Sequence, residues 1–276
     1  MLRKFVVATD LSHRSDRAVA RAFELAARHG AAVSIVHVVD DELPDALAAA
    51  ITADAETRLT RFVETQLKTT DIVHDCRVIP GDPAEAIVSE AGREEADLVI
   101  LGLHRARPFL DSVRETTMER IVRHCARPVL LVRDPADHAY SRVLAAVDFT
   151  PASTAALSFA ARLLPGAALH AVHALHVPYR GFTAPAGQAT AAAPFLNEAR
   201  GELARWRARE DLPDALGEVE IIEGSIESTL LRHIAAHRAD LLCLGAHGRA
   251  GVFRAILGSV TMDLIRTPPC DLLIGR

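Results

Sequence analysis

The stretch that decides the fold runs from Asp240 to Met262 and reads DLLCLGAHGRAGVFRAILGSVTM. Its beginning, Leu241 to Leu244, is a short apolar run typical of a buried parallel strand. Three glycines and a serine follow with the spacing Gly-x2-Gly-x9-Gly-Ser. Glycine lets backbone N–H groups approach a ligand closely, and the first N–H groups of a helix have no partner of their own. A strand, a glycine turn and a hydroxyl-bearing helix start therefore predict a phosphate cradle.

This spacing differs from two common phosphate-binding motifs, because the loop has no Gly-Lys-Ser/Thr and does not read Gly-x-Gly-x-x-Gly. The spacing, the preceding strand and the trailing Val260-Thr261 together resemble the ATP-binding motif of the universal stress protein family. Loop glycines by themselves mark turns more often than nucleotide sites. The interpretation therefore depends on the context that the rest of the chain provides.

Composition limits the possible classes of function. At 276 residues with 50% hydrophobic side chains, the chain is long enough for two domains with buried cores. A net charge of -5 and a pI near 6.2 argue against binding to nucleic acid or to an anionic membrane. The N-terminus meets polar residues too early for a signal segment and no apolar run reaches membrane-spanning length, so we expect a cytoplasmic protein. The cysteines lack close pairing and are expected to be reduced core thiols, with no disulfide or zinc site: Cys76, Cys125, Cys243 and Cys270.

The chain contains an internal repeat. KFVVATD at 4–10 matches RVLAAVD at 142–148, and each copy is an apolar strand closed by an aspartate. A longer stretch, 79–104, aligns without a gap with 222–247. The same strand and helix order is therefore expected twice, with the polar stretch 133–141 as the linker.

Within each copy, apolar strands alternate with amphipathic segments such as 16–28, which carries apolar residues at helical spacing. This order predicts a parallel sheet covered on both faces, and an open doubly wound sheet is its simplest topology. The strands expected in the first copy are 4–9, 33–39, 73–79, 97–102 and 128–132. The family resemblance implies two tandem flavodoxin-like (Rossmann-like) α/β domains, 1–134 and 139–276, each a five-stranded parallel sheet flanked by helices.

In the second copy, the resemblance implies a nucleotide site in which the residues below surround ATP, with or without Mg²⁺. They are Val147, Asp148, Ala174, Gly245, His247, Gly248, Gly258, Ser259, Val260 and Thr261. Asp148 would accept a hydrogen bond from the adenine, although a carboxylate at that position could also cap the next helix. Val147 and Ala174 would contact the base, but both are also ordinary core residues.

The remaining positions have structural alternatives as well. His247 would lie near the ribose and phosphates, yet its counterpart His104 is present in a copy without the complete motif, so both could be structural. Ser259 and Thr261 would bind phosphate or cap the helix. The glycines Gly245, Gly248 and Gly258 are the residues on which the prediction mainly depends.

The first copy departs from the motif. Asp10 and Gly102 remain, but two of the motif glycines are replaced, so this half is not expected to bind ATP in the manner of the family. Its loop arginines, Arg105, Arg107 and Arg114, could bind another anion or form a solvated surface. The second copy has an insertion, 178–194, rich in Pro, Gly and Ala, which is either a lid or a surface excursion.

Catalytic signatures are weak. The chain has no Gly-x-Ser-x-Gly elbow and no His-Glu-x-x-His. His170, His173 and His176 suggest a metal site, but alternation along a strand sends His173 to the opposite face from the other two. The glycine loop has no acid for magnesium, and Asp263 is one helical turn further, so any ATP hydrolysis is expected to be weak.

The sequence thus predicts an ATP-binding cytoplasmic stress-response regulator with an unidentified protein partner, no nucleic acid and no membrane. The alternatives are a slow ATPase or ATP-using transferase of the same fold, or a binder of another small molecule or lipid. In the family, last strands often pair across a twofold axis. Here Val129–Val132 and Leu272–Ile274 could pair within one chain as an internal pseudo-dimer, with a homodimer of chains as a further possibility.

Overall fold

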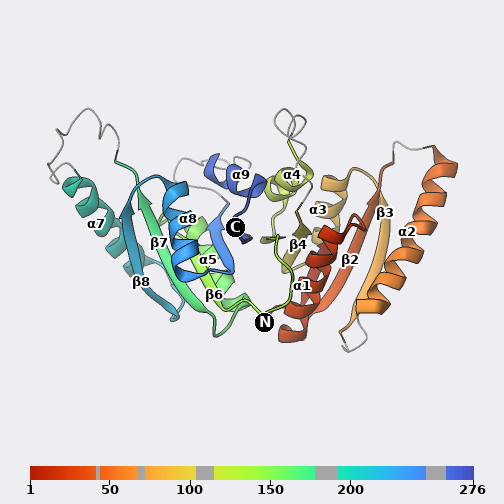
Figure 1. The fold of residues 1–276 in the computed structure, drawn as a ribbon, viewed down its shortest axis with the longest axis horizontal. Coiled ribbons are helices and arrows are strands. Elements are labelled where there is room, and N and C mark those ends of the chain that lie inside the picture. The colour runs from red at the N-terminus through yellow and green to blue at the C-terminus, as the bar shows by residue number, and fades with distance from the viewer. Residues whose placement is uncertain (42–43, 67–71, 104–114, 178–191, 247–258) are drawn as a thin grey trace. The chain divides into compact units, whose positions relative to one another are not determined.

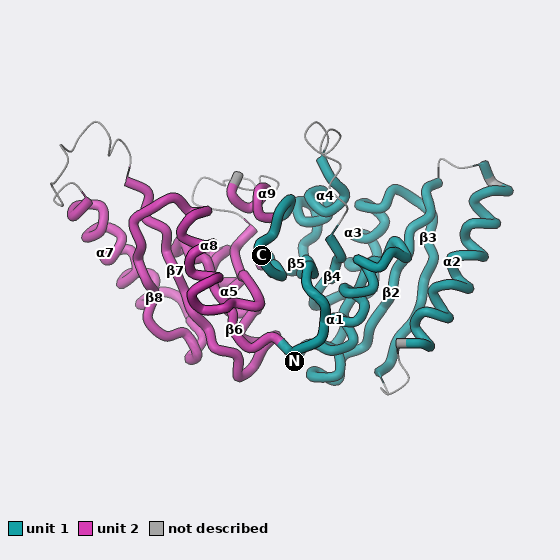
Figure 2. The backbone as a smooth tube through the Cα atoms, viewed as in Figure 1, with its two compact units in different colours: residues 1–139, 265–274 teal, residues 140–264, 275–276 magenta. Residues whose placement is uncertain are grey.

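The computed structural model describes residues 1–41, 44–66, 72–103, 115–177, 192–246 and 259–276. The chain forms two compact units (Figure 2). The first contains residues 1–139 and 265–274, and the second contains residues 140–264 and 275–276. Each unit alternates strands and helices along the chain, as Figure 1 shows.

The first repeat follows the predicted order closely. Its elements are β1 (Lys4–Ala8), α1 (His13–His29), β2 (Ala32–Val39), α2 (Asp45–Gln66), β3 (His74–Pro80), α3 (Pro83–Arg93), β4 (Leu98–Gly102), α4 (Thr117–His124) and β5 (Val129–Val132). The predicted strands agree with these bounds to within one residue at each end. The helix predicted over 16–28 begins earlier, at His13, because Ser12 starts its first turn and Gly30 ends it with a left-handed φ of 63°.

The second repeat has the same order of strands and helices. Its elements are β6 (Arg142–Ala146), α5 (Pro151–Leu163), β7 (Ala168–Leu175), α7 (Ala193–Arg209), β8 (Leu216–Glu223), α8 (Ile226–His237), β9 (Leu241–Gly245), α9 (Ser259–Arg266) and β10 (Asp271–Gly275). Helix α5 packs on β9 and β6, α7 packs on β7 and β8, and α8 packs on β6 and β7. No described helix has the length and apolar character needed to cross a bilayer.

Strand order confirms the doubly wound topology. In the first repeat the order is β3-β2-β1-β4-β5, all parallel, and the second repeat matches it with β8-β7-β6-β9. The fifth strand of the second repeat is different, because β10 pairs antiparallel with β5, Leu272 opposite Leu131 and Ile274 opposite Val129. The strand pairing expected between these two segments is therefore confirmed. The winding direction reverses between β1 and β4 and between β6 and β9, and ligands of such sheets bind at the carboxyl ends of those strands.

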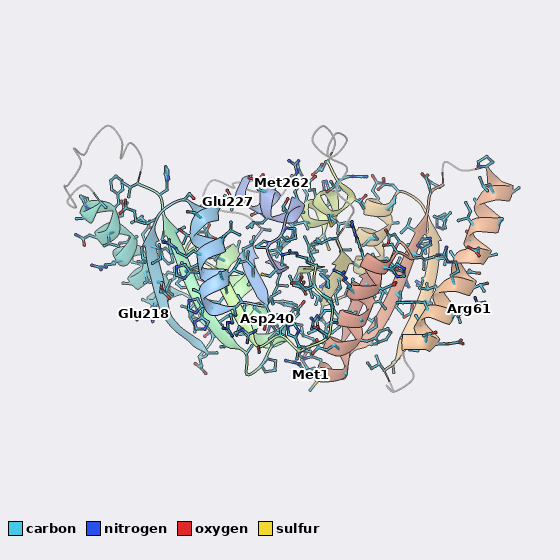
Figure 3. All side chains as sticks on the ribbon, in the orientation of Figure 1. Met1, Arg61, Glu218, Glu227, Asp240 and Met262 are labelled. Atoms are coloured by element: carbon cyan, nitrogen blue, oxygen red, sulfur yellow. The ribbon has the colours of Figure 1, made fainter. Side chains whose placement is uncertain are left out.

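In each repeat, an aspartate links the amino-terminal ends of two neighbouring strands. The Asp97 carboxylate accepts hydrogen bonds from the backbone N–H groups of Arg3 and Lys4, at 2.6 and 3.1 Å. In the second repeat Asp240, labelled in Figure 3, accepts from Ser141 and Arg142, both at 3.0 Å. In each case the aspartate immediately before one strand fixes the start of its neighbour, which sets the parallel register.

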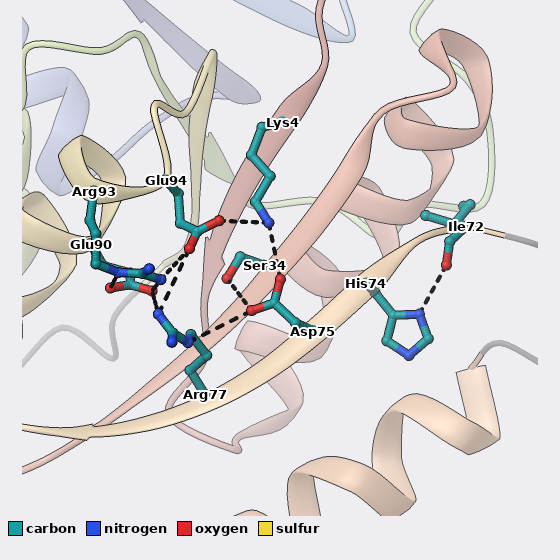
Figure 4. Close-up of polar contacts among 9 residues, drawn as sticks. All are labelled: Lys4, Ser34, Ile72, His74, Asp75, Arg77, Glu90, Arg93 and Glu94. Atoms are coloured by element: carbon teal, nitrogen blue, oxygen red, sulfur yellow. Dashed lines mark hydrogen bonds and ion pairs between the residues drawn. The ribbon is translucent and has the colours of Figure 1, made fainter.

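A charged network ties β1 and β3 to α3 (Figure 4). Lys4 pairs with Asp75 at 3.0 Å and with Glu94 at 2.8 Å, and Arg77 pairs with Glu90 at 2.8 Å. Burial lowers the pKa of Lys4, but its hydrogen bonds to Glu94 and Asp75 outweigh burial, and the net pKa lies above its ordinary value. Because each charged side chain of the network has a partner of opposite charge within it, we assign these residues to stabilisation of the fold.

The cysteines differ in burial, and the prediction that all four are core thiols holds for three of them. Cys125, Cys243 and Cys270 are buried, and burial raises the pKa of Cys243 to about 12. Cys76 is exposed, so the prediction that it is a core thiol is wrong. It lies on β3, which pairs with β2 and ends the order of the described strands, and none of the residues of β3 is fully buried.

Candidate functional site

The carboxyl ends of β6, β7 and β9 bring four of the predicted site residues together. The backbone pairs Ala146 with Val172 on β7 and with Leu244 on β9, so Val147 and Asp148 continue beside Gly245. Ala174 lies near the carboxyl end of β7. Val147 is buried, and its N–H donates to the Val172 carbonyl at 3.0 Å. This is the edge where the topology predicts a ligand.

Asp148 shapes the turn that follows β6. Its Oδ1 accepts hydrogen bonds from the Thr150 N–H at 3.2 Å and from the Thr150 hydroxyl at 2.6 Å. Thr150, and not Asp148, is the N-cap of α5, since its side chain accepts from the Ser153 N–H. The alternative that Asp148 caps the helix directly is therefore wrong, and its carboxylate orients the residue that does.

The first repeat builds the same turn. Asp10 accepts from the Ser12 N–H at 3.0 Å, and Ser12 is the N-cap of α1. Burial acts to raise the pKa of Asp10, but hydrogen bonds from Ser12 and Ser15 outweigh it and hold the pKa below 3.8. In both copies the residue after the aspartate is non-glycine with a left-handed φ, 59° at Leu11 and 65° at Phe149. Such residues cost about 1–3 kcal/mol and are often found at ligand sites.

In each repeat, a histidine side chain contacts the backbone carbonyl of the residue just before the aspartate. His173 Nδ1 lies 2.8 Å from the Val147 carbonyl, and its ring stacks on Phe149 with centroids 4.4 Å apart. In the first repeat His37 Nδ1 lies 2.8 Å from the Thr9 carbonyl. His173 is buried at 8% exposure, whereas His176, just after β7, is exposed. A histidine at this repeated position therefore has a structural role that the sequence pattern did not reveal.

Gly245 is required by packing. A Cβ there would lie 2.7 Å from the Ala152 carbonyl carbon and 2.8 Å from the Ser153 nitrogen, at the start of α5. Gly102 is in the same situation in the first repeat, with its Cβ position 2.8 Å from the Arg14 carbonyl oxygen. The persistence of Gly102 in a copy without the full motif is thus explained by close helix approach.

The remaining predicted residues fall mainly outside the described part of the chain. His247, Gly248 and Gly258 lie in 247–258, which the structure does not describe, and for Ser259 only its place as the first residue of α9 is described. In the same first turn of α9, Val260 is half-buried and Thr261 is 7% exposed. The loop arginines at 105, 107 and 114, and residues 178–191 of the insertion, also lie outside the described ranges.

The first unit holds a cavity of about 280 Å³ at its own switch point. Its walls come from the carboxyl ends of β1, β2 and β4 and from α3 and α4, and include Asp10, His37, Gly102 and Thr117. Most of its other lining residues are apolar, among them Ile87 and Met118. A hollow therefore remains at the expected ligand edge in the repeat whose glycine motif is incomplete.

The class that the fold defines is the doubly wound α/β protein, in which ligands, where they bind, lie at the carboxyl edge of the sheet near the switch point. The model of the universal stress protein family matches residues 1–133 and again 139–276. The chain therefore belongs to the universal stress protein family.

Individual relatives agree with this assignment. A universal stress protein of Synechocystis sp. is 29% identical over 181 residues, a match that spans 65% of this chain and 58% of that protein. A universal stress protein of Thermus aquaticus is 30% identical over 138 residues, which cover 48% of this chain and 100% of that protein.

Solved structures show the same fold along nearly the whole chain. A universal stress protein from Archaeoglobus fulgidus has a TM-score of 0.69 at 20% identity and covers 99% of this chain and 96% of its own. A Pseudomonas aeruginosa protein of unknown function has a TM-score of 0.63 at 18% identity, with 99% and 92% covered. At these identities the likeness establishes the fold.

Proposed function

We propose that this protein is a cytoplasmic, ATP-binding regulator of the stress response whose nucleotide site lies in the second repeat. The observation that carries the proposal is the position of the Gly-x2-Gly-x9-Gly-Ser motif. It begins at the last residue of β9, next to β6 and Asp148, where the strand order reverses. Glycine N–H groups and a helix start at such an edge match the chemistry of a polyphosphate.

In this proposal, different site residues contact the adenine, the ribose and the phosphates. Val147 and Ala174 contact the adenine, and Asp148 accepts a hydrogen bond from it. An ionised carboxylate offers about four acceptor positions, so support of the Thr150 turn is compatible with recognition of a base. His247 approaches the ribose and phosphates. Backbone N–H groups at Gly248 and Gly258 and in the first turn of α9, at Ser259, Val260 and Thr261, bind the phosphates.

Gly245 has a different role in this proposal. The contacts with Ala152 and Ser153 at the start of α5 already require a glycine there. Gly245 therefore shapes the floor of the site, and Gly248 and Gly258 remain as the glycines that face phosphate.

Regulation fits the residues better than strong catalysis. Fast phosphoryl transfer requires a positioned magnesium and a group that orients the nucleophile. The loop 247–258 contains no acid, and the nearest one along the chain is Asp263 in α9. Binding of ATP would then change the surface that is available to a protein partner, and ATP hydrolysis would be slow or absent.

The test is calorimetric titration of ATP, with and without Mg²⁺, into the full chain and into Gly248→Val and Gly258→Val. We expect one site in the wild type and a loss of about 100-fold or more in either variant, which corresponds to about 2.8 kcal/mol. Gly217→Ala is the matched control, because Gly217 lies in β8 with nothing within 4 Å of its Cβ position. Undiminished binding in both valine variants would refute the site.

A further inference from the structure

Three potential metal ligands converge in the second unit, on elements that carry none of the nucleotide motif. They are Glu220 on β8 and His233 and His237 on α8. One ligand atom from each lies within 4.8 Å of the other two. His237 Nε2 is 3.7 Å from Glu220 Oε1, and His233 Nδ1 is 4.0 Å from Glu220 Oε2.

These separations are too long for hydrogen bonds, which join nitrogen and oxygen at roughly 2.7–3.2 Å. The three side chains therefore face one another without closing the cluster themselves. Two ligands bound to one tetrahedral zinc ion, each at about 2.0–2.2 Å, lie roughly 3.3–3.6 Å apart. The Glu220 pairs, at 3.7 and 4.0 Å, are slightly longer than this, so small side-chain rotations would bring all three ligands onto one ion.

His233 supplies an independent observation. It is 9% exposed, and its Nδ1 has no hydrogen-bond partner among the described residues. A buried polar atom left without a partner costs about 1–3 kcal/mol. Because Nδ1 is also the atom that faces Glu220, a cation placed between the two groups would supply the missing interaction.

The backbone and a neighbouring ring place these ligands. His233 and His237 are four residues apart on α8, so both project from one face of the helix. The register of β7 and β8 sets Glu220 beside Val172, and α8 packs on β7. The His170 ring, also on β7, stacks on the His237 ring with centroids 4.2 Å apart, which restricts rotation of His237.

We propose that Glu220, His233 and His237 form a binding site for a divalent transition metal ion, with Zn²⁺ as the best match. Two imidazole nitrogens and one carboxylate are ligands that zinc accepts readily, whereas magnesium and calcium prefer oxygen alone. His237 and Glu220 are 26% and 46% exposed, so water completes the coordination from the solvent side. His170 is a positioning residue that fixes the His237 ring.

The test uses the chelator-treated full chain, titrated with Zn²⁺ in competition with a chromophoric chelator. We expect one equivalent to bind, and Glu220→Gln and His237→Gln to weaken it at least about tenfold, since even loss of an outer partner of a metal ligand costs 10–100-fold. Both altered side chains are partly exposed, so the variants should fold. Co²⁺ bound in place of Zn²⁺ should show the visible absorption of a nitrogen-ligated site.

Two control variants carry other zinc-binding side chains from the described part of the chain, His176→Gln and Cys76→Ser, both at exposed positions. These should leave Zn²⁺ affinity unchanged. His233→Gln, checked by circular dichroism for folding, should behave like His237→Gln. The proposal is overturned if the wild type binds no Zn²⁺, or if affinity survives in both Glu220→Gln and His237→Gln.

Discussion

At the scale of single residues, the two repeats show which features belong to the fold and which are specific to one copy. The Asp turn, the supporting histidine and the glycine against the next helix occur in both. Gly248 and Gly258 have no counterpart in the first copy. The shared residues therefore build the edge of the sheet, and the proposed nucleotide site depends in addition on glycines found only in the second copy.

This distinction makes Gly245→Ala a test of packing. The added Cβ would overlap the backbone of Ala152 and Ser153, and overpacking of this kind costs about 1–3 kcal/mol. We expect this decrease in the free energy of unfolding to be measured by urea denaturation in the absence of any nucleotide. Gly217→Ala, at an open position of the same unit, should change stability far less. Equal stability of Gly245→Ala and the wild type would show that α5 can move away from β9.

At the scale of elements, helix starts are fixed by side chains that the hydrophobic pattern does not reveal. Asp82 caps α3 by accepting from the N–H groups of Ala84 and Glu85, both at 3.0 Å, and it also pairs with Arg120 on α4 at 2.7 Å. One carboxylate thus joins two helices. The hydrogen bond from Arg120 is the main reason that the pKa of Asp82 lies below 3.8.

Substitutions at Asp82 should separate the cap from the ion pair. Asp82→Ala should lose about 0.5–2 kcal/mol through the missing cap, whereas Asp82→Asn keeps a good capping side chain and loses only the pair with Arg120. The native pKa lies below the unfolded one, so stabilisation by the ionised group is fully present above the unfolded pKa. The advantage of the wild type over Asp82→Asn should therefore hold at neutral pH and disappear as the pH falls through the native pKa, below 3.8.

Urea unfolding of the wild type and both variants at several pH values measures this. Glu85, which is 82% exposed and 3.6 Å from Arg120, is the matched control, and Glu85→Gln should show little effect at any pH. An advantage over Asp82→Asn that persists at the lowest pH would contradict the assignment of the pKa shift.

At the scale of the whole molecule, the polar stretch predicted as a linker is fixed to the first unit. Arg21, 1% exposed, donates to the carbonyls of Pro135 and His138 and lies 4.0 Å from Asp271. Asp271 is fully buried and accepts from the N–H groups of Arg133 and Asp134, at 2.7 and 2.9 Å. The first residue of β10 therefore helps to hold the segment after β5.

Asp271→Asn should be strongly destabilising. The substitution replaces a buried charge with a neutral amide, which weakens the hydrogen bonds from the Arg133 and Asp134 N–H groups. Arg21 keeps its ion pair with Glu24 at 3.2 Å. A hydrogen bond to a charged group contributes about 1.5–3 kcal/mol, so we expect a loss of about that size. Asp54→Asn is the control, because Asp54 and Arg58 form an exposed pair at 3.8 Å that should contribute less than about 1 kcal/mol. Chemical unfolding followed by circular dichroism measures both. Similar losses in the two variants would show that the buried carboxylate contributes no more than a surface one.

The sequence by itself determined the repeat, the strand positions, the doubly wound order and the family, because these depend on local periodicity and on spacing along the chain. It also predicted the segments that pair as β5 and β10. Only the tertiary structure showed that Thr150 caps α5 in place of Asp148, that Gly245 is required by helix packing, and that Cys76 is exposed. It alone brought Glu220, His233 and His237 together. Contacts of this kind depend on how a helix packs back on its sheet, and no pattern within a single element contains that information.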